Sequence, residues 1–173
     1  GRLDGVGGAL ARRVAALDHW LDWGAAIKAR AHGRVRQWRG RPVITFQPTP
    51  ADVALFRRGV RVLADVMFAA GAEVVSPGVA GLPSPLGPHQ VHLIDEATLR
   101  PSAYKAAMTH LFGTCRMGGD PKANVVRPDF RHHRVAGLYV ADSSVFPTNL
   151  GVNPQIPIMA LAARCADRAL EAA

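Results

Sequence analysis

The sequence predicts a mixed α/β fold, and three observations support this. Two stretches carry apolar residues at helical spacing between helix-start and helix-stop residues, and shorter runs alternate as strands do. Near the C-terminus, an apolar run is followed by a polar turn, a loop and an amphipathic helix pattern, an order typical of strand–loop–helix units. With 173 residues, 49% hydrophobic and 20% charged, the chain can bury a core.

Two N-terminal helices are expected. Apolar residues at helical intervals predict a short helix over 8–21. Thr49-Pro50-Ala51-Asp52 then offers a capping hydroxyl, a proline at the first helical position and an acid three residues after the cap. Gly71 supplies a helix stop. The apolar face of this second helix consists of Val53, Phe56, Val60, Leu63, Met67 and Ala70.

Strands are expected between these helices. Residues 25–31 alternate, and His32-Gly33 separates them from Arg34 to Trp38, a pattern typical of a β-hairpin. A third strand, Val43 to Gln47, would follow a turn at Gly40-Arg41.

The remaining elements are shorter until the end of the chain. A brief strand over 73–75 precedes a proline- and glycine-rich loop at 76–92 and a possible short helix over 95–105, interrupted early by Pro101. Leu138 to Ala141 predicts a buried strand. The final helix has Pro157 in its first turn. Its apolar face would contain Ile156, Met159, Ala163, Ala166 and Leu170.

Composition excludes several classes of protein. The net charge of +8 invites a nucleic-acid interpretation, but the basic residues are dispersed and no nucleic-acid motif occurs. Cys115 and Cys165 are too few for a disulfide framework. No apolar stretch reaches the roughly 18 residues of a membrane span, and no signal peptide is visible. The compartment stays open, with the cytoplasm favoured.

His110 and Asn153 are the candidate catalytic residues, each in a loop ahead of the final helix. Gly113 lets the backbone near His110 approach another group closely. Each residue has a plainer alternative: His110 as a hydrogen-bonded core histidine, and Asn153 as a turn residue capping the last helix. Spacing alone leaves both alternatives open.

The C-terminal motifs resemble the glucose–methanol–choline family of flavin-dependent alcohol oxidoreductases. Gly-Val-Asn-Pro resembles the cholesterol-oxidase-like branch, in which Asn replaces a second His. The resemblance is specific after residue 105 and weaker over 25–75. In order along the chain, the matching positions are His110, Gly113-Thr114-Cys115, Met117, Val125-Val126, Pro128, Gly137-Leu138, Val140, Asp142, Ser144, Pro147-Thr148 and Asn153-Pro154.

The resemblance implies roles for six residues of the chain. His110 would accept the proton of the substrate hydroxyl, and Asn153 would hydrogen-bond the same oxygen. The remaining four would lie against FAD: Asp142 and Ser143 near its pyrophosphate and ribityl chain, and Pro154 and Gln155 beside its isoalloxazine ring.

Energetics constrain the implied reaction. An alcohol of pKa about 15.7 and an ordinary imidazole of pKa about 6.5 differ by about 9 units, or about 12 kcal/mol. A free alkoxide is therefore too costly as a separate step. We expect proton transfer to His110 to accompany hydride departure to the flavin.

The chain departs from the family pattern in three places. Leu111 stands where proline often follows the histidine, Arg127 replaces a usual aspartate, and no Gly-x-Gly-x-x-Gly motif occurs. We therefore expect a segment that lacks the N-terminal FAD-binding portion, is inactive alone and does not bind FAD tightly. Residues 1–105 would form part of an antiparallel substrate-binding domain with helices. Residues 106–173 would supply the last strand and helix of a Rossmann-like FAD-binding domain.

Other functions are weaker alternatives. His89 and His92 lie in a proline-rich loop, and their surroundings do not give zinc spacing, so no metal site is expected. Ser143 and Ser144 lack the Gly-x-Ser-x-Gly elbow of hydrolases. The main alternative is a stand-alone basic domain that binds an anionic partner and has no redox role.

Overall fold

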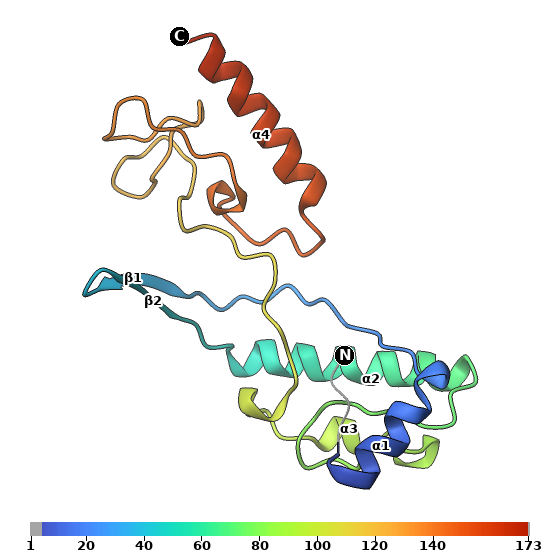
Figure 1. Ribbon diagram of the computed structural model, residues 1–173. Helices are drawn as coiled ribbons and strands as arrows, with labels where there is room; N and C mark the ends of the chain where they lie inside the picture. Colours follow the sequence, from blue (N-terminus) through green and yellow to red (C-terminus); the bar gives the residue numbers. More distant parts are fainter. Residues whose placement is uncertain (1–4, 173) are drawn as a thin grey trace. The chain divides into compact units, whose positions relative to one another are not determined.

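The computed structural model describes residues 5–172 (Figure 1). Its contacts divide the chain into two compact units. The first unit contains the described residues up to Ile27 together with Pro50–Lys105. The second, called the C-terminal unit below, contains Lys28–Thr49 together with the described residues from Ala106 onward. The described residues include helices and a two-stranded antiparallel sheet, which confirms a mixed α/β composition.

The long predicted helix is confirmed as α2, Pro50–Ala69. It begins at Pro50. The first N–H groups of a helix have no intrahelical partner, and proline has no N–H, so it suits this position. It ends in a Schellman motif at Gly71, whose φ is +95°. The N–H of Ala72 donates to the Met67 carbonyl (2.9 Å) and the N–H of Gly71 to the Phe68 carbonyl (3.0 Å).

One face of α2 carries the core of its unit. Two adjoining clusters of buried side chains pack the helix against the segment that follows it. Val60 and Leu82 contact both clusters. The buried members are Val53, Val79, Ala97, Ala103 and Tyr104 in the first cluster, and Ala64, Val75, Leu86 and Ile94 in the second.

The segment after α2 is mostly turns. Val75 and Leu86 form an isolated bridge at the position of the predicted short strand. Two short helices follow, η2 at Pro88–Gln90 and α3 at Leu93–Glu96. The predicted helix over 95–105 is wrong, because the extended backbone of Ala97 ends α3 and a separate turn, η3, spans Pro101–Ala103.

The first predicted helix is shorter than expected. Helix α1 spans Gly7–Ala15 and is followed by the 3-10 turn η1, Leu17–His19. Between them, Ala16 leaves the helical region at φ −103° and ψ 16°. The Arg13 guanidinium donates a hydrogen bond to the Ser84 carbonyl (2.8 Å), which ties α1 to the loop of the same unit.

The hairpin lies one strand later than predicted. β1 (Arg34–Trp38) pairs with β2 (Arg41–Thr45) across Arg39 and Gly40, whose φ values of +48° and +78° favour a type I′ turn. The expected strand over 25–31 is wrong, since those residues have no regular structure. A Cβ at Gly33 would lie 2.8 Å from the Thr45 carbonyl oxygen, so this glycine permits close backbone approach instead of a turn.

The C-terminal unit is built on loops around buried Val126, Phe130 and Val145. Isolated bridges join Met117 to Val126 and Val126 to His132. The predicted buried strand over 138–141 is wrong for this chain, because only Tyr139 forms a bridge and Leu138 is 43% exposed. A strand needs a neighbouring strand along its length, and this run has none among the described residues.

The final predicted helix is confirmed as α4, Gln155–Leu170. Its buried residue is Cys165, whereas Ile156 and Met159 from the predicted apolar face are 80% and 62% exposed. The helix therefore keeps an uncovered apolar side within this chain. Among the described residues, no helix has both the length and the apolar character needed to cross a bilayer.

Candidate active site

His110 lies on an exposed, strained stretch of backbone. Its φ is +56°, in the left-handed region that residues with a side chain seldom occupy. Its Nδ1 lies 3.5 Å from the hydroxyl oxygen of Thr109, which is at the limit for a hydrogen bond. The imidazole is exposed, so the alternative of a hydrogen-bonded core histidine is wrong. Strain of this kind persists where a side chain has to be presented in one orientation.

The segment after His110 runs beside residues 144–146. The rings of Phe112 and Phe146 meet edge to face, with centroids 5.7 Å apart and planes at 83°. The N–H of Cys115 donates to the Ser144 carbonyl (3.1 Å), and the N–H of Met117 donates to the Val145 carbonyl (2.9 Å). These contacts fix the loop that carries His110 against the segment that leads towards Asn153.

Asp142 and Ser143 begin the 3-10 turn η4, Ser143–Val145. The Asp142 carboxylate accepts a hydrogen bond from the Ser144 N–H (2.7 Å), and it therefore caps this turn. Its second oxygen makes no hydrogen bond within residues 5–172 and can accept one from a further donor. The Ser144 hydroxyl is buried and has no hydrogen-bond partner among residues 5–172. A buried hydroxyl without a hydrogen-bond partner destabilises the fold, unless a further group supplies that partner.

Asn153 precedes α4 in an exposed loop. This loop bends at Gly151, which has φ +75° and whose N–H donates to the Asn149 side chain (2.7 Å). The carboxamide of Asn153 makes no hydrogen bond within residues 5–172, and α4 has no side-chain cap. The alternative of Asn153 as a cap for the last helix is therefore wrong. Its amide can both donate to and accept from a ligand.

Pro154 and Gln155 form the start of α4, with Pro154 buried and Gln155 exposed. The first turn contains neither a side-chain cap nor an acidic residue. Pro157 has no N–H and the Ile158 N–H donates to the Pro154 carbonyl (2.9 Å), so the N–H groups of Gln155 and Ile156 and the positive end of the helix dipole are the groups left for a ligand. Together with the Ser144 hydroxyl and the Asn153 amide, they offer polar groups to an electron-rich ligand.

The structure links the two catalytic candidates only indirectly. His110 and Asn153 belong to the same unit, and the contacts of residues 112–117 with 144–146 connect their loops. No hydrogen bond joins the two side chains within the described part of the chain. Sequence reasoning missed the orphaned Ser144 hydroxyl and the Phe112–Phe146 contact, which no local spacing pattern reveals.

Comparison with known proteins decides the family. The model of the family described as GMC oxidoreductase matches residues 29–162, well over half of the chain. This chain belongs to the GMC oxidoreductase family. The match includes every candidate site residue, from His110 to Gln155. The resemblance to the C-terminal part of this family is thereby confirmed, whereas its cholesterol-oxidase-like form stays a prediction.

Relatives agree with this GMC assignment. An uncharacterized GMC-type oxidoreductase of Sinorhizobium fredii is 38% identical over 146 residues, which cover 83% of this chain and 29% of that protein. A long-chain-alcohol oxidase of Arabidopsis thaliana is 49% identical over 53 residues, which cover 31% of this chain and 7% of that protein. The chain thus spans less than a third of the length of each.

A solved structure shows the same fold. The crystal structure of pyridoxine 4-oxidase from Mesorbium loti aligns with a TM-score of 0.51 at 23% identity. The alignment covers 82% of this chain and 28% of that structure. The similarity at this identity concerns the fold of the GMC segment.

Proposed function

We propose that this chain is the C-terminal, base-carrying part of a flavin-dependent oxidoreductase that converts a CH–OH group into a carbonyl. One observation carries the proposal: inside the region that matches the GMC family, His110 is exposed on strained backbone in a loop fastened to the segment before Asn153. The relative named as a long-chain-alcohol oxidase supports an alcohol as the substrate class. Family membership also favours this redox role over a stand-alone basic domain.

His110 is the proposed proton acceptor. An exposed imidazole has an acceptor nitrogen that can take the hydroxyl proton of a bound alcohol. The Nδ1 contact with Thr109 leaves Nε2 available for this proton. The left-handed backbone at His110 supports this role, because it directs the Cα–Cβ bond differently from an ordinary helical or extended residue. Such positioning contributes to catalysis because less orientational freedom is lost at the transition state.

Asn153 is the proposed orienting residue. Its carboxamide makes no hydrogen bond within residues 5–172, so its N–H can donate to the substrate oxygen from which His110 takes the proton. A donor aimed at that oxygen stabilises the negative charge that develops as the proton leaves. The two residues together would form the His/Asn pair of the cholesterol-oxidase-like branch.

Asp142, Ser143, Pro154 and Gln155 are the proposed FAD contacts. When bound, FAD supplies the acceptor for the hydride that leaves the alcohol carbon. One Asp142 oxygen already caps Ser144, so only the other oxygen is free to accept a hydrogen bond from the cofactor. The buried Ser144 hydroxyl is an additional donor on the same turn. Gln155 and the first N–H groups of α4 would lie beside the isoalloxazine ring of FAD.

The test is flavin binding and reduction. We expect a protein that joins this chain to the remaining length found in its relatives to purify with flavin absorbance. An alcohol added without oxygen should then bleach that absorbance, while the present chain alone should stay colourless. A joined, folded protein that takes up no flavin, or whose flavin no alcohol reduces, would contradict the proposed function.

A further inference from the structure

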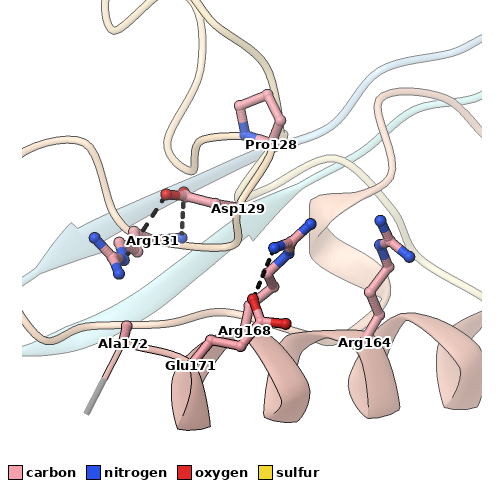
Figure 2. A pocket seen from close by; sticks show the side chains of 7 residues that line it. All are labelled: Pro128, Asp129, Arg131, Arg164, Arg168, Glu171 and Ala172. Carbon is pink, nitrogen blue, oxygen red and sulfur yellow. Dashed lines mark hydrogen bonds and ion pairs between the residues drawn. The ribbon is translucent and has the colours of Figure 1, made fainter.

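An arginine-rich pocket lies in the C-terminal unit, apart from the proposed flavin and substrate residues (Figure 2). It has a volume of about 410 Å³ and is formed by the turn at Pro128–Arg131 and the last turns of α4. Small-molecule sites have volumes of roughly 300–1,000 Å³, so the space is sufficient for a small ligand. The lining residues are Pro128, Asp129, Arg131, Arg164, Arg168, Glu171 and Ala172.

The positive charges of this arginine pocket exceed the negative ones. Arg131 lies 3.8 Å from the Asp129 carboxylate, and Arg168 donates to Glu171 at 2.7 Å. Arg164 has no hydrogen bond or ion pair within residues 5–172. The lining therefore contains three guanidinium groups and two carboxylates, and Arg164 is the cation without a carboxylate partner among the described residues.

The position of Arg164 is not explained by the helix itself. Arg168 lies in the last turn of α4, where a cation complements the negative end of the helix dipole. Arg164 lies one turn earlier, outside that last turn. At a spacing of four residues the two cations are neighbours on one helix face and repel each other. Figure 2 shows both side chains projecting from α4 towards the loop that carries Pro128 and Asp129.

We propose that this arginine pocket binds a small molecule that carries a phosphoryl group. Guanidinium groups match phosphate oxygens with paired N–H donors, and three arginines from two elements can surround three oxygens. Asp129 and Glu171 each use part of one guanidinium, and a guanidinium has five N–H donors, so Arg131 and Arg168 keep donors for phosphoryl oxygens beside those of Arg164. The negative charge of a bound phosphoryl group offsets the unmatched charge of Arg164 and reduces its repulsion with Arg168.

Titration of the present chain with inorganic phosphate and with glycerol phosphate tests this proposal. Binding would be followed by amide chemical shifts in NMR at constant ionic strength, with sodium chloride as the reference salt. We expect saturable shifts in the turn at 128–131 and in α4 around Arg164. Tighter binding of the ester would identify an organic phosphate as the natural source, and equal binding would identify free phosphate.

The discriminating variant is Arg164→Gln, with Arg58→Gln as the matched control. Arg58 is exposed on α2 in the other unit, so the control removes the same charge outside the pocket. We expect Arg164→Gln to weaken phosphate binding at least about tenfold and Arg164→Lys to weaken it less, since lysine keeps the charge but loses the paired donors. Arg58→Gln should change it less than about twofold, as for a distant surface charge.

Three outcomes would overturn the proposal. The first is the absence of any saturable shift with phosphate in the wild-type chain. The second is an equal loss of binding in the two Arg→Gln variants, as non-specific attraction to net charge requires. Shifts confined to residues outside the pocket would also contradict it. The amide spectrum of each variant reports its folding. If Arg164→Gln loses phosphate binding while its spectrum outside the pocket is unchanged, unfolding is excluded as the cause of the loss.

Discussion

The rings of Phe112 and Phe146 meet edge to face at 5.7 Å, and this contact joins the loop of His110 to the segment that precedes Asn153. Two backbone hydrogen bonds, from Cys115 to Ser144 and from Met117 to Val145, run beside it. The aromatic pair thus adds side-chain packing to a backbone connection between two stretches that are distant in sequence. The proposed chemistry requires these two stretches to stay together.

The aromatic pair should therefore be energetically coupled. In a double-mutant cycle of Phe112→Leu and Phe146→Leu, we expect a coupling free energy of about 0.5–1.5 kcal/mol in the stability of the C-terminal unit. Urea denaturation followed by circular dichroism measures it. The pair Phe56–Tyr104, with centroids 5.7 Å apart and planes at 84°, is the matched control in the other unit. Additive losses at Phe112 and Phe146 would show that the contact does not stabilise the loop.

The core beneath α2 should be sensitive to cavities. Leu86 is fully buried, and Leu86→Ala should lower the free energy of unfolding by about 2–5 kcal/mol. Leu55 on α2 is 44% exposed, and Leu55→Ala should cost less than about 1 kcal/mol. Chemical denaturation of both variants measures the difference. Equal losses would mean that the packing of Leu86 against its cluster is described wrongly.

The two cysteines should differ in reactivity. Burial raises the pKa of the Cys165 thiol, which lowers the fraction of reactive thiolate, whereas Cys115 is partly exposed. We expect a thiol reagent to modify Cys115 in the native chain and Cys165 only after denaturation. In Cys115→Ser, native labelling should then nearly vanish. Rapid labelling of that variant would contradict the burial of the Cys165 side chain on α4.

Tyr104 should make stability depend on alkaline pH. Burial raises the pKa of its phenol, while the charge of nearby Arg57 lowers it, and burial is the larger effect. The native state then keeps a proton that the unfolded chain releases. Stability is fully present below the unfolded phenol pKa of about 10 and falls as the pH rises through the native pKa.

Replacing Tyr104 with Phe should remove that alkaline decline. At neutral pH the same variant should cost about 1 kcal/mol, because the Tyr104 hydroxyl donates to the Thr98 carbonyl at 2.8 Å. Urea midpoints measured between about pH 8 and pH 11 test both effects, since the phenol titrates there. An alkaline slope that is unchanged in the variant would show that another group causes it.

The sequence predicts α2 and α4 well because their signals are local. Pro50 and Gly71 mark the ends of one helix, and Pro157 marks the first turn of the other. Strands depend on distant partners, and this explains both errors. Residues 25–31 alternate but pair with no strand in the described part of the chain, while 34–38 pairs across Arg39-Gly40, and 138–141 obtains a single bridge.

The types and order of residues along the sequence predict the candidate site residues, but they do not predict the geometry of these residues. The ordered motifs from His110 to Pro154 identify the family, which the match over residues 29–162 confirms. The positive φ of His110 and the orphaned hydroxyl of Ser144 depend on how the chain folds around them, so no spacing reveals them. The assignment of 1–105 and 106–173 to two domains, and the roles of the six site residues, stay predictions.

The central claim is that His110 and Asn153 act on one substrate oxygen. A double-mutant cycle of His110→Asn and Asn153→Ala, on the rate of flavin reduction by an alcohol in the joined, flavin-loaded protein, tests it most directly. We expect His110→Asn to lower that rate about 10²–10⁴-fold, with Asn153→Ala costing less. The double variant should lose far less than the product of the two single losses. A near-normal rate in His110→Asn, or strictly multiplicative losses, would contradict the claim.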